Sequence, residues 1–425
     1  MMDVEDVGAR DAEMGRRGDA EKNPAVEISV SPRLRVSASS SNASSPTAAL
    51  LTPRGRGAVA TIQLHGDVSL LDNGDAPLFQ AANGQLAANQ PLQRIVFGRW
   101  GSTQDGQPPE EIVVCRTASD TVEIHCHGGD AASARILADL ERRGCEIVTA
   151  FDLSKQRTST FEAECLDAVS RAVTLRTAAM LIDQQSGTLR NAFENLRTEL
   201  SHSPLTTHHS PLLHDLLRWS NFGLHLTQPW RVVLAGRPNV GKSSLINALV
   251  GYQRSIVFDE PGTTRDVVTA ETALDGWPIQ FADTAGLRDV DADDVESAGI
   301  ELARRQLADA DLRLLVVDLS QPMTGEDDCL LAEWTDAIVI ANKSDLPNAW
   351  QPESPTEYLT VSARTGAGID KLCEAIAAQL VPEVPPTVTP VPITARQFQL
   401  LAYIVQAVVN HDSPLAIQLC DELLA

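Results

Sequence analysis

The chain has 425 residues, of which 43% are hydrophobic, so it is long enough for two to four domains with ordinary buried cores. It carries 34 basic and 57 acidic residues, and this net charge of −23 argues against nonspecific attraction of the whole surface to nucleic acid. Seven scattered cysteines form no C-x-x-C pair, which favours reduced thiols over a disulfide framework. Because no apolar run could cross a bilayer and no apolar signal core opens the chain, we expect a cytoplasmic protein without a membrane partner.

The first elements predict a leader followed by a small domain. Residues 1–45 are rich in charged residues, glycine and serine, with little periodic hydrophobicity, and we expect them to be a disordered leader or an overlong start. Residues 46–150 contain four strand-like runs and then one helical pattern: VATIQL, IVFGRW, EIVVCR, TVEIHC and DAASARILADLERRG. This order predicts a small N-terminal α/β domain.

The pattern of the rest of the chain predicts helical segments before and after a region in which strands and helices alternate. Residues 151–227 contain long stretches at helical spacing: FEAECLDAVSRAVTLRTAAMLI, LRNAFENLRTEL and PLLHDLLRWSNFGLHL. In residues 228–381, apolar strands alternate with helical segments, which predicts a mostly parallel sheet covered on both faces. The proline-rich residues 382–392 are expected to be an extended linker. Residues 393–425 are too short to form a domain alone, and we expect them to pack against 151–227.

The segment GRPNVGKS at 236–243 has the context of a phosphate-binding loop, because it follows the apolar run RVVLA and precedes the helical pattern SLINALVG. Its glycines let backbone N–H groups converge on phosphate oxygens, and the next helix N-terminus adds partial positive charge. We expect Lys242 to contact the β- and γ-phosphates and Ser243 to bind magnesium. Asp283, which ends a later strand, is placed to hold the same ion through water. For an isolated loop, an ordinary glycine turn before a helix is the alternative.

Two further segments indicate which base is bound. NKSD at 342–345 follows the strand AIVIA, and Asp345 can accept hydrogen bonds from the ring N–H and the exocyclic amine of guanine. Adenine lacks this pair of donors. An isolated N-K-x-D tetrapeptide is more often a solvated turn, but here it follows the strand AIVIA at the proper distance. SAR at 362–364 follows the strand YLTV and is expected to close over the base with its backbone.

The segments between these motifs are expected to respond to the γ-phosphate. Thr264, in GTTRD, is the candidate for a second magnesium-binding hydroxyl in a mobile switch, with a simple turn as the alternative. DTAG ends at Gly286, and Leu287 stands where many GTPases have the glutamine that orients the attacking water. The acidic pair Asp327 and Asp328 is expected to be exposed charge. The predicted nucleotide-binding residues are Asn239, Val240, Gly241, Lys242, Ser243, Ser244, Thr263, Thr264, Asp283, Gly286, Asn342, Lys343, Asp345, Ser362, Ala363 and Arg364.

These motifs together resemble the MnmE (TrmE) family of tRNA-modifying GTPases. The resemblance is carried by GRPNVGKSSLINALVG, GTTRDV, DTAGLRD, DDVESAGIE, NKSD and SARTG, and by TPRGRGAVATIQLHG and TVEIHCHGG nearer the N-terminus. It implies an α/β fold in which a Ras-like P-loop GTPase domain is inserted into an α-helical domain and preceded by a small N-terminal α/β domain. It also implies a homodimer, GTP and Mg²⁺ binding, and potassium-stimulated hydrolysis driven by dimerisation of the GTPase domains. The implied partners are an FAD-containing MnmG-like protein and tRNA, whose wobble uridine is modified with a folate one-carbon unit.

The family's special residues carry over in part. Asn239 matches the asparagine that ligates potassium, and Thr263 falls in the loop that surrounds the ion. Glu296 matches the glutamate that orients the hydrolytic water and is the predicted catalytic residue, although the preceding loop is one residue longer than usual. Gln63 replaces the arginine of the folate pocket while Glu123 is retained, so we expect folate binding to be weakened. The family's C-terminal F-C-x-G-K motif has no counterpart before Ala425.

Two cellular roles remain open from the sequence. One is tRNA wobble modification with an MnmG-like protein. The other is that of a diverged paralogue whose GTP-dependent dimer acts as a switch or assembly factor without modification chemistry. A ribosome-assembly GTPase of the Era or Der type is disfavoured, because the sequence predicts neither a basic RNA-binding C-terminal domain nor a second GTPase domain.

Overall fold

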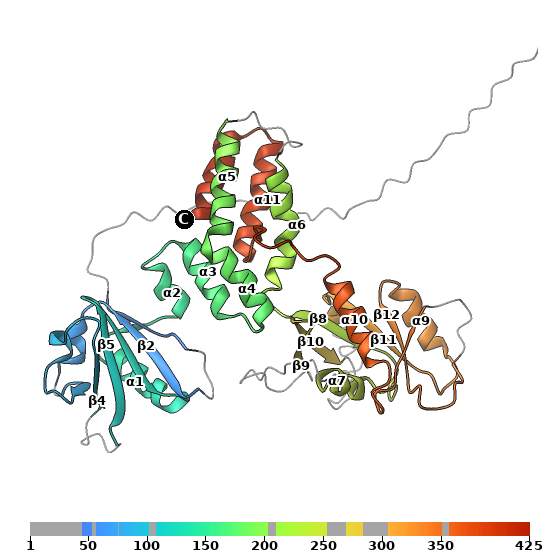
Figure 1. Ribbon diagram of the computed structural model, residues 1–425, viewed down its shortest axis with the longest axis horizontal. Helices are drawn as coiled ribbons and strands as arrows, with labels where there is room; N and C mark the ends of the chain where they lie inside the picture. Colours follow the sequence, from blue (N-terminus) through green and yellow to red (C-terminus); the bar gives the residue numbers. More distant parts are fainter. Residues whose placement is uncertain are drawn as a thin grey trace, which may run out of the picture. The chain divides into compact units, whose positions relative to one another are not determined.

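The structure is a computed structural model that describes residues 45–52, 57–74, 76–101, 108–202, 210–252, 269–283, 305–350 and 357–425. These residues form two sheets and several helices (Figure 1). The predicted leader, residues 1–45, lies outside the described residues except for Ser45. No helix of the described part is long and apolar enough to cross a membrane.

The first sheet has seven strands in the order β3-β4-β5-β6-β2-β1-β7, and only the β1–β7 pair is parallel. The four predicted strands and the helix are present, whereas the three shortest strands could not be predicted because they are too short to show alternation. The elements are β1 (Thr47–Leu50), β2 (Val59–His65), η1 (Val68–Leu71), β3 (Phe79–Ala81), η2 (Ala87–Asn89), β4 (Ile95–Trp100), β5 (Glu110–Ala118), β6 (Thr121–His127), α1 (Asp130–Arg142) and β7 (Glu146–Ile147).

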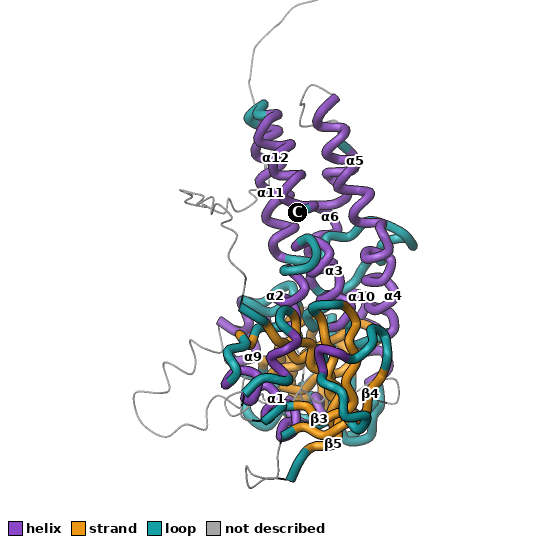
Figure 2. Tube along the Cα trace, turned by 90° about the vertical axis from the view of Figure 1, so that its left-hand side faces the viewer, coloured by secondary structure: helices purple, strands orange, loops and turns teal. Residues whose placement is uncertain are grey.

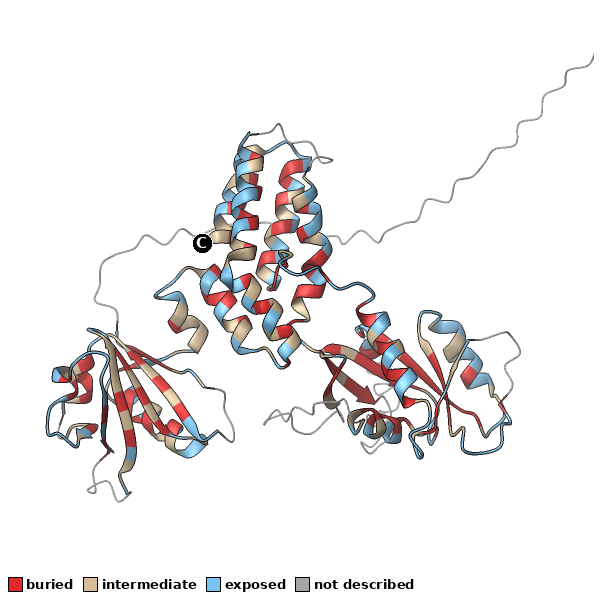
Figure 3. Ribbon diagram, viewed as in Figure 1, coloured by how far each residue is buried: buried red, intermediate tan, exposed pale blue. Residues whose placement is uncertain are grey.

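Burial alternates along the strands of this sheet, as Figure 3 shows. In β4, Val96 and Trp100 are buried in a core that includes Ile136 of α1, whereas Ile95 and Phe97 are exposed. Alternation of this kind is typical of an antiparallel sheet with one face packed on a core and the other open. The open face therefore presents apolar side chains.

Helices follow in the next part of the chain: α2 (Ala150–Lys155), α3 (Thr160–Ser170), α4 (Leu175–Asp183), the π-helical turn η4 (Gln184–Thr188), α5 (Leu189–His202) and α6 (Pro211–Leu224). The long helical pattern at 161–182 is divided between α3 and α4. Thr174 interrupts it because its side chain accepts a hydrogen bond from Thr177 N, which caps α4, and its hydroxyl donates to Gly276 O at 2.7 Å.

The second sheet has six strands in the order β13-β12-β11-β8-β10-β9, and all neighbours are parallel except the β9–β10 hairpin. The mostly parallel sheet predicted for this region is confirmed. Its elements are β8 (Trp230–Ala235), α7 (Lys242–Val250), β9 (Thr269–Leu274), β10 (Trp277–Asp283), β11 (Leu312–Asp318), α9 (Gly325–Glu333), β12 (Ile338–Asn342), β13 (Leu359–Thr360) and α10 (Ile369–Leu380).

The strands of this sheet are buried almost throughout (Figure 3) because helices cover both faces. On β8, Leu234 joins the core that contains Leu245 of α7 and Leu372 of α10. The next residue, Ala235, joins a separate cluster against which Leu331 of α9 packs. Because successive residues of β8 are buried on opposite faces of the sheet, the strand is apolar at consecutive positions instead of at alternate ones.

The last two helices, α11 (Ala395–Val409) and α12 (Ser413–Leu424), lie beside α5 and α6 (Figures 1 and 2). Arg396 of α11 contacts both carboxylate oxygens of Glu164 in α3, at 2.6 and 2.8 Å, across 232 residues of sequence. The expected packing of the chain's last residues against the earlier helices is confirmed, although α12 itself was not predicted. The buried Gln184 also accepts from Val391 N and donates to Thr389 O, so the end of the proline-rich segment is held against these helices.

Candidate nucleotide-binding site

The predicted nucleotide-binding segments meet at one edge of the six-stranded sheet. The loop from Gly236 follows β8, Asp283 ends β10, and Asn342 ends β12. Because these strands are parallel, their carboxyl ends lie together, which is where open α/β sheets bind ligands. The topology thus brings together motifs that are more than 100 residues apart in the sequence.

The phosphate-binding loop has a backbone path that requires glycine. Gly241 has φ +97°, and a Cβ at this position would lie 2.5 Å from Nδ2 of Asn342. Gly236 has φ +145°, and its Cβ would collide with the carbonyl of Val316. Because Gly241 provides no side-chain cap for α7, the amide groups of the first helical turn can bind an anion.

Lys242 and Ser243 extend the chemistry of the loop. The ammonium group of the buried Lys242 donates to the carbonyls of Gly236 and Arg237, at 2.8 and 3.1 Å, and so lies across the concave loop. The hydroxyl of Ser243 donates to Asp283 Oδ2 at 2.7 Å, which joins the start of α7 to the end of β10. A hydroxyl and a carboxylate at this distance suit a hard divalent cation such as magnesium.

The NKSD segment is bonded to the phosphate-binding loop. Asn342 is buried, donates to Val240 O at 2.9 Å and accepts from Ala363 N at 3.0 Å. Lys343 Nζ donates to Asn239 O at 2.8 Å. The backbone at Asn239 and Lys343 is left-handed, with φ of +64° and +66°. These contacts fix the spacing between the part that can bind phosphates and the part that can bind a base.

The carboxyl group of Asp345 is held by a hydrogen bond and lies near a cation. Its Oδ1 accepts a hydrogen bond from the Ser362 hydroxyl at 2.7 Å, and Arg364 lies 3.8 Å from its Oδ2. The hydrogen bond from Ser362 and the charges of Arg364 and Lys343 lower the pKa of the Asp345 carboxyl below its ordinary value. An ionised carboxylate only accepts hydrogen bonds, which matches the two donors on the edge of guanine.

The structure brings most of the predicted site residues together. Val240 of the loop is buried, and Ser244 lies exposed in the first turn of α7. Four predicted residues lie outside the described residues: Thr263, Thr264, Gly286 and Glu296.

Two acidic residues that contact this site were missed or wrongly interpreted from the sequence. Asp327 was expected to be exposed, but its side chain is wholly buried and accepts a hydrogen bond from Arg237 Nε at 2.9 Å. Asp318, at the end of β11, accepts from Lys343 Nζ at 2.6 Å. Burial raises the pKa of the Asp318 carboxyl, but hydrogen bonds from Lys343 and Ser320 outweigh this and lower it. Its position at a strand end beside the expected site was the available signal.

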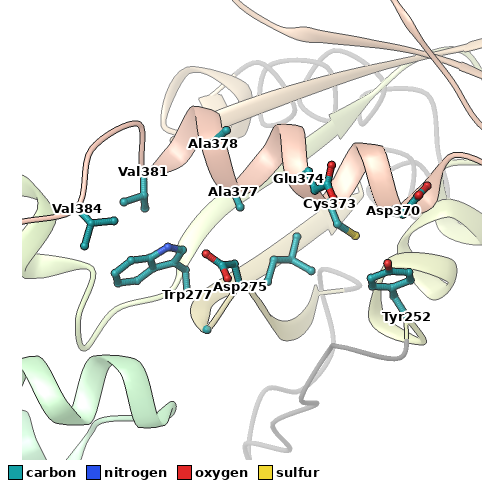
Figure 4. A pocket seen from close by; sticks show the side chains of 12 residues that line it. Tyr252, Asp275, Trp277, Asp370, Cys373, Glu374, Ala377, Ala378, Val381 and Val384 are labelled. Atoms are coloured by element: carbon teal, nitrogen blue, oxygen red, sulfur yellow. The ribbon is translucent and has the colours of Figure 1, made fainter.

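A cavity of about 600 Å³ lies apart from these residues, between the β9–β10 hairpin and α10 (Figure 4). Trp277, Val381 and Val384 form apolar walls, and Asp370 and Glu374 come from α10. None of the predicted nucleotide-binding residues that the structure describes lines it. Cavity volume alone therefore does not identify the functional site of this chain.

A second cavity, of about 530 Å³, lies beside Gln63. Arg157 donates to Gln63 Oε1 at 3.1 Å, and Gln63 Nε2 is 3.4 Å from Glu123. Arg157 could not be placed there from the sequence, because it is 94 residues from Gln63 in the chain. Within the described part of the chain, the cavity lining contains one cation, Arg157, and one anion, Asp167.

Known proteins are similar to the central part of this chain or to most of its length. Residues 231–343 match the family described as 50S ribosome-binding GTPase. The tRNA modification GTPase MnmE of Geobacillus thermodenitrificans is 34% identical over 377 residues, which are 78% of this chain and 80% of that protein. MnmE of Lacticaseibacillus paracasei is 31% identical over 399 residues, 83% of this chain and 85% of that protein. Among solved structures, the G domain of the T. maritima FeoB iron transporter is 26% identical, with a TM-score of 0.26, over 36% of this chain and 99% of that chain.

The fold and the site define a P-loop GTPase, an enzyme that hydrolyses GTP. At 34% identity over more than three quarters of its length, the chain belongs to the MnmE family of tRNA modification GTPases.

Proposed function

We propose that this GTPase takes part in modifying the wobble uridine of tRNA, together with an MnmG-like partner that carries FAD. The proposal is supported by relatives named as tRNA modification GTPases, each matched along about four fifths of its own length. The observation that carries the nucleotide part is the bonded link between the two halves of the site, Asn342 to Val240 and Lys343 to Asn239. This link holds a guanine-binding carboxylate at a set distance from the phosphate-binding loop.

The proposed roles at the site follow from these contacts. The loop 236–243 holds the phosphates, and Asp345 with the SAR segment at 362–364 holds the base. Ser243 and Thr264 ligate magnesium, with Asp283 contacting it through water. Glu296 orients the attacking water. Glu296→Ala should therefore leave GTP binding near normal and slow hydrolysis by on the order of 100-fold or more, whereas a loss of binding would indicate a structural role instead.

We also propose that Asn239 ligates potassium. Its carbonyl is held by Lys343, so the residue is fixed in position before any cation binds. A potassium ion there would supply positive charge where other GTPases use an arginine finger. Turnover should fall when sodium replaces potassium. Equal rates in the two salts would count against this role of Asn239.

The proposed domains are 46–150, 151–227, 228–381 and 393–425, with a linker at 382–392, and the GTPase domain interrupts the helical one. We propose that the first of them forms a homodimer. The support is the open face of its sheet, where Ile95 is 73% and Phe97 50% exposed on β4. Phe97→Glu should convert a dimer to a monomer in light scattering. A chain that is monomeric before the change would remove this part of the proposal.

Folate binding is proposed to be weak. Among the described residues that line the cavity beside Gln63, Arg157 is the one cation, and it already donates to Gln63. From these described residues, the two carboxylates of a folate glutamate tail would meet one cation beside the carboxylate of Asp167. Calorimetric titration with a reduced folate should give no heat at micromolar concentration; clear saturation would show that Arg157 substitutes for the missing groups.

The alternative function, a GTP-dependent switch or assembly factor without modification chemistry, is separated from the first by one experiment. Wobble nucleosides of total tRNA are quantified by mass spectrometry in a strain that lacks this chain. The proposal expects loss of the modified nucleosides and recovery when the chain is restored. Unchanged tRNA in the presence of a normal MnmG-like protein would favour the switch.

A further inference from the structure

Arg237 of the phosphate-binding loop is paired with a carboxylate that the sequence separates from it by 90 residues. Its Nε donates to Asp327 Oδ1 at 2.9 Å. The Asp327 side chain is wholly buried, and only 21% of the Arg237 side chain is exposed. The other carboxylate oxygen, Oδ2, accepts from the backbone N–H and the hydroxyl of Thr324, each at 3.0 Å. Both oxygens of Asp327 are therefore bonded.

The backbone of Arg237 is held as well. Its carbonyl accepts from Lys242 Nζ at 3.1 Å, next to the Gly236 carbonyl at 2.8 Å. The residue that follows is Pro238, whose ring fixes its own φ and restricts the backbone of Arg237. Arg237 is thus fixed at the carbonyl by Lys242 and at the guanidinium by α9. A phosphate cradle requires such fixation, because its amide groups must already converge when the phosphate arrives.

Helix capping alone does not account for burying this carboxylate. Asp327 is the third residue of α9 and bonds back to Thr324, as in a capping box, but an exposed side chain can do the same. Burying a carboxylate is costly unless a cation and further hydrogen bonds compensate for the loss of water. Here the compensating cation comes from the phosphate-binding loop, so the folding of α9 and the path of the loop are coupled.

We propose that Asp327 is a positioning residue for nucleotide binding, which acts through Arg237 to fix the first part of the phosphate-binding loop. Neither residue needs to touch the nucleotide. The proposal rests on the assignment of loop 236–243 as the phosphate cradle. α9 then serves as a support for the loop from the opposite face of the sheet to α7 and α10.

The test measures the Kd of labelled GDP, and KM and kcat for GTP, in the full chain. Asp327→Asn keeps the size of the side chain but loses the charge that holds Arg237. We expect Kd and KM to rise on the order of tenfold, the scale seen when a group that orients a binding residue is removed, while kcat changes by less than about threefold. The matched control is Asp328→Asn, the same change at the next residue, whose side chain is exposed. It should leave all three constants unchanged.

Two further variants separate positioning from stability. Arg237→Met should raise Kd as Asp327→Asn does, and the double variant should be no worse than either single one, because both remove the same contact. Arg237→Lys, which keeps the charge, should recover part of the lost affinity. If Asp327→Asn does not fold, the two variants Arg237→Met and Arg237→Lys provide the same comparison. A lower melting temperature with unchanged Kd and KM, or effects that multiply in the double variant, would overturn the proposal.

Lys242→Ala distinguishes failure of this inference from failure of the assignment beneath it. If the loop is the phosphate cradle, this variant loses GDP binding whatever Asp327 does. Retained binding in Lys242→Ala would refute the cradle itself. Lost binding in Lys242→Ala together with normal binding in Asp327→Asn would refute only the positioning role.

Discussion

Gly241→Ala should weaken nucleotide binding without unfolding the protein, and its effect can be worked from the structure. A left-handed backbone costs a residue with a Cβ about 1–2 kcal/mol, and Gly241 has φ +97°. The new Cβ would also lie 2.5 Å from Asn342 Nδ2, so Asn342 must move. It would then lose its hydrogen bonds to Val240 O and Ala363 N, each contributing about 0.5–1.5 kcal/mol.

These terms sum to about 2–5 kcal/mol, which corresponds to a Kd for GDP about 30-fold to a few thousand-fold higher. The loop of the free variant can relax, so most of the cost should appear on binding and little in the melting temperature. The assay is fluorescence titration with labelled GDP beside a thermal melt. The control is Gly325→Ala at the start of α9, where a Cβ would meet no atom within 4 Å. A normal Kd in Gly241→Ala, or equal weakening in Gly325→Ala, would refute the reasoning.

Three other results are expected. Glu164→Ala should lower the free energy of unfolding by about 2–4 kcal/mol, because it leaves the partly buried Arg396 without its carboxylate. The measurement is urea titration followed by circular dichroism. As a control, Asp421→Ala breaks the exposed ion pair between α5 and α12 and should lower the free energy of unfolding by under about 1 kcal/mol. Cys329 is exposed and should react with a thiol reagent at pH 8 well before the buried thiols. Burial raises the pKa of these thiols to about 11 or 12, and they belong to Cys145, Cys165, Cys373 and Cys420. Fast reaction of the buried thiols in the folded protein would contradict the packing. The pKa of Asp318 is lowered in the folded protein, so its charge stabilises the fold above the ordinary pKa of 3.8, and this contribution is lost as the pH falls through the pKa of the folded state. The difference in melting temperature between the wild-type chain and Asp318→Asn should therefore shrink below about pH 4. A difference that does not depend on pH would show that the charge of Asp318 is irrelevant to stability.

The residues that could be predicted from the sequence belong to short segments with local constraints. Lys242 and Asp345 belong to motifs that can be interpreted because each follows a predicted strand. The strands β8 and β12 could be predicted from their apolar runs, because both faces of that sheet are covered. The parallel topology then brings these motifs to one edge without further information.

The contacts that could not be predicted join residues far apart in the chain. Asp327 looks like solvated charge beside Asp328, and only the fold shows that Arg237 lies against it. Arg157 likewise comes next to Gln63 through the packing of α2 and α3 near the first sheet. The division between α3 and α4 depends on Thr174, whose hydroxyl bonds to the β9–β10 hairpin 102 residues later. Side-chain pairs of this kind leave no local pattern.

A comparison of GDP with xanthosine diphosphate binding, in the wild-type chain and in Asp345→Asn, tests guanine-nucleotide specificity most directly. Calorimetry on the wild-type chain should show saturable heat with GDP and none with xanthosine diphosphate. In Asp345→Asn, an amide donor faces the position where guanine carries an amine and xanthine a carbonyl, so the preference should reverse, with GDP affinity falling on the order of 100-fold or more. No heat with GDP in the wild-type chain, or an unchanged preference for guanine in Asp345→Asn, would contradict the assignment of this site.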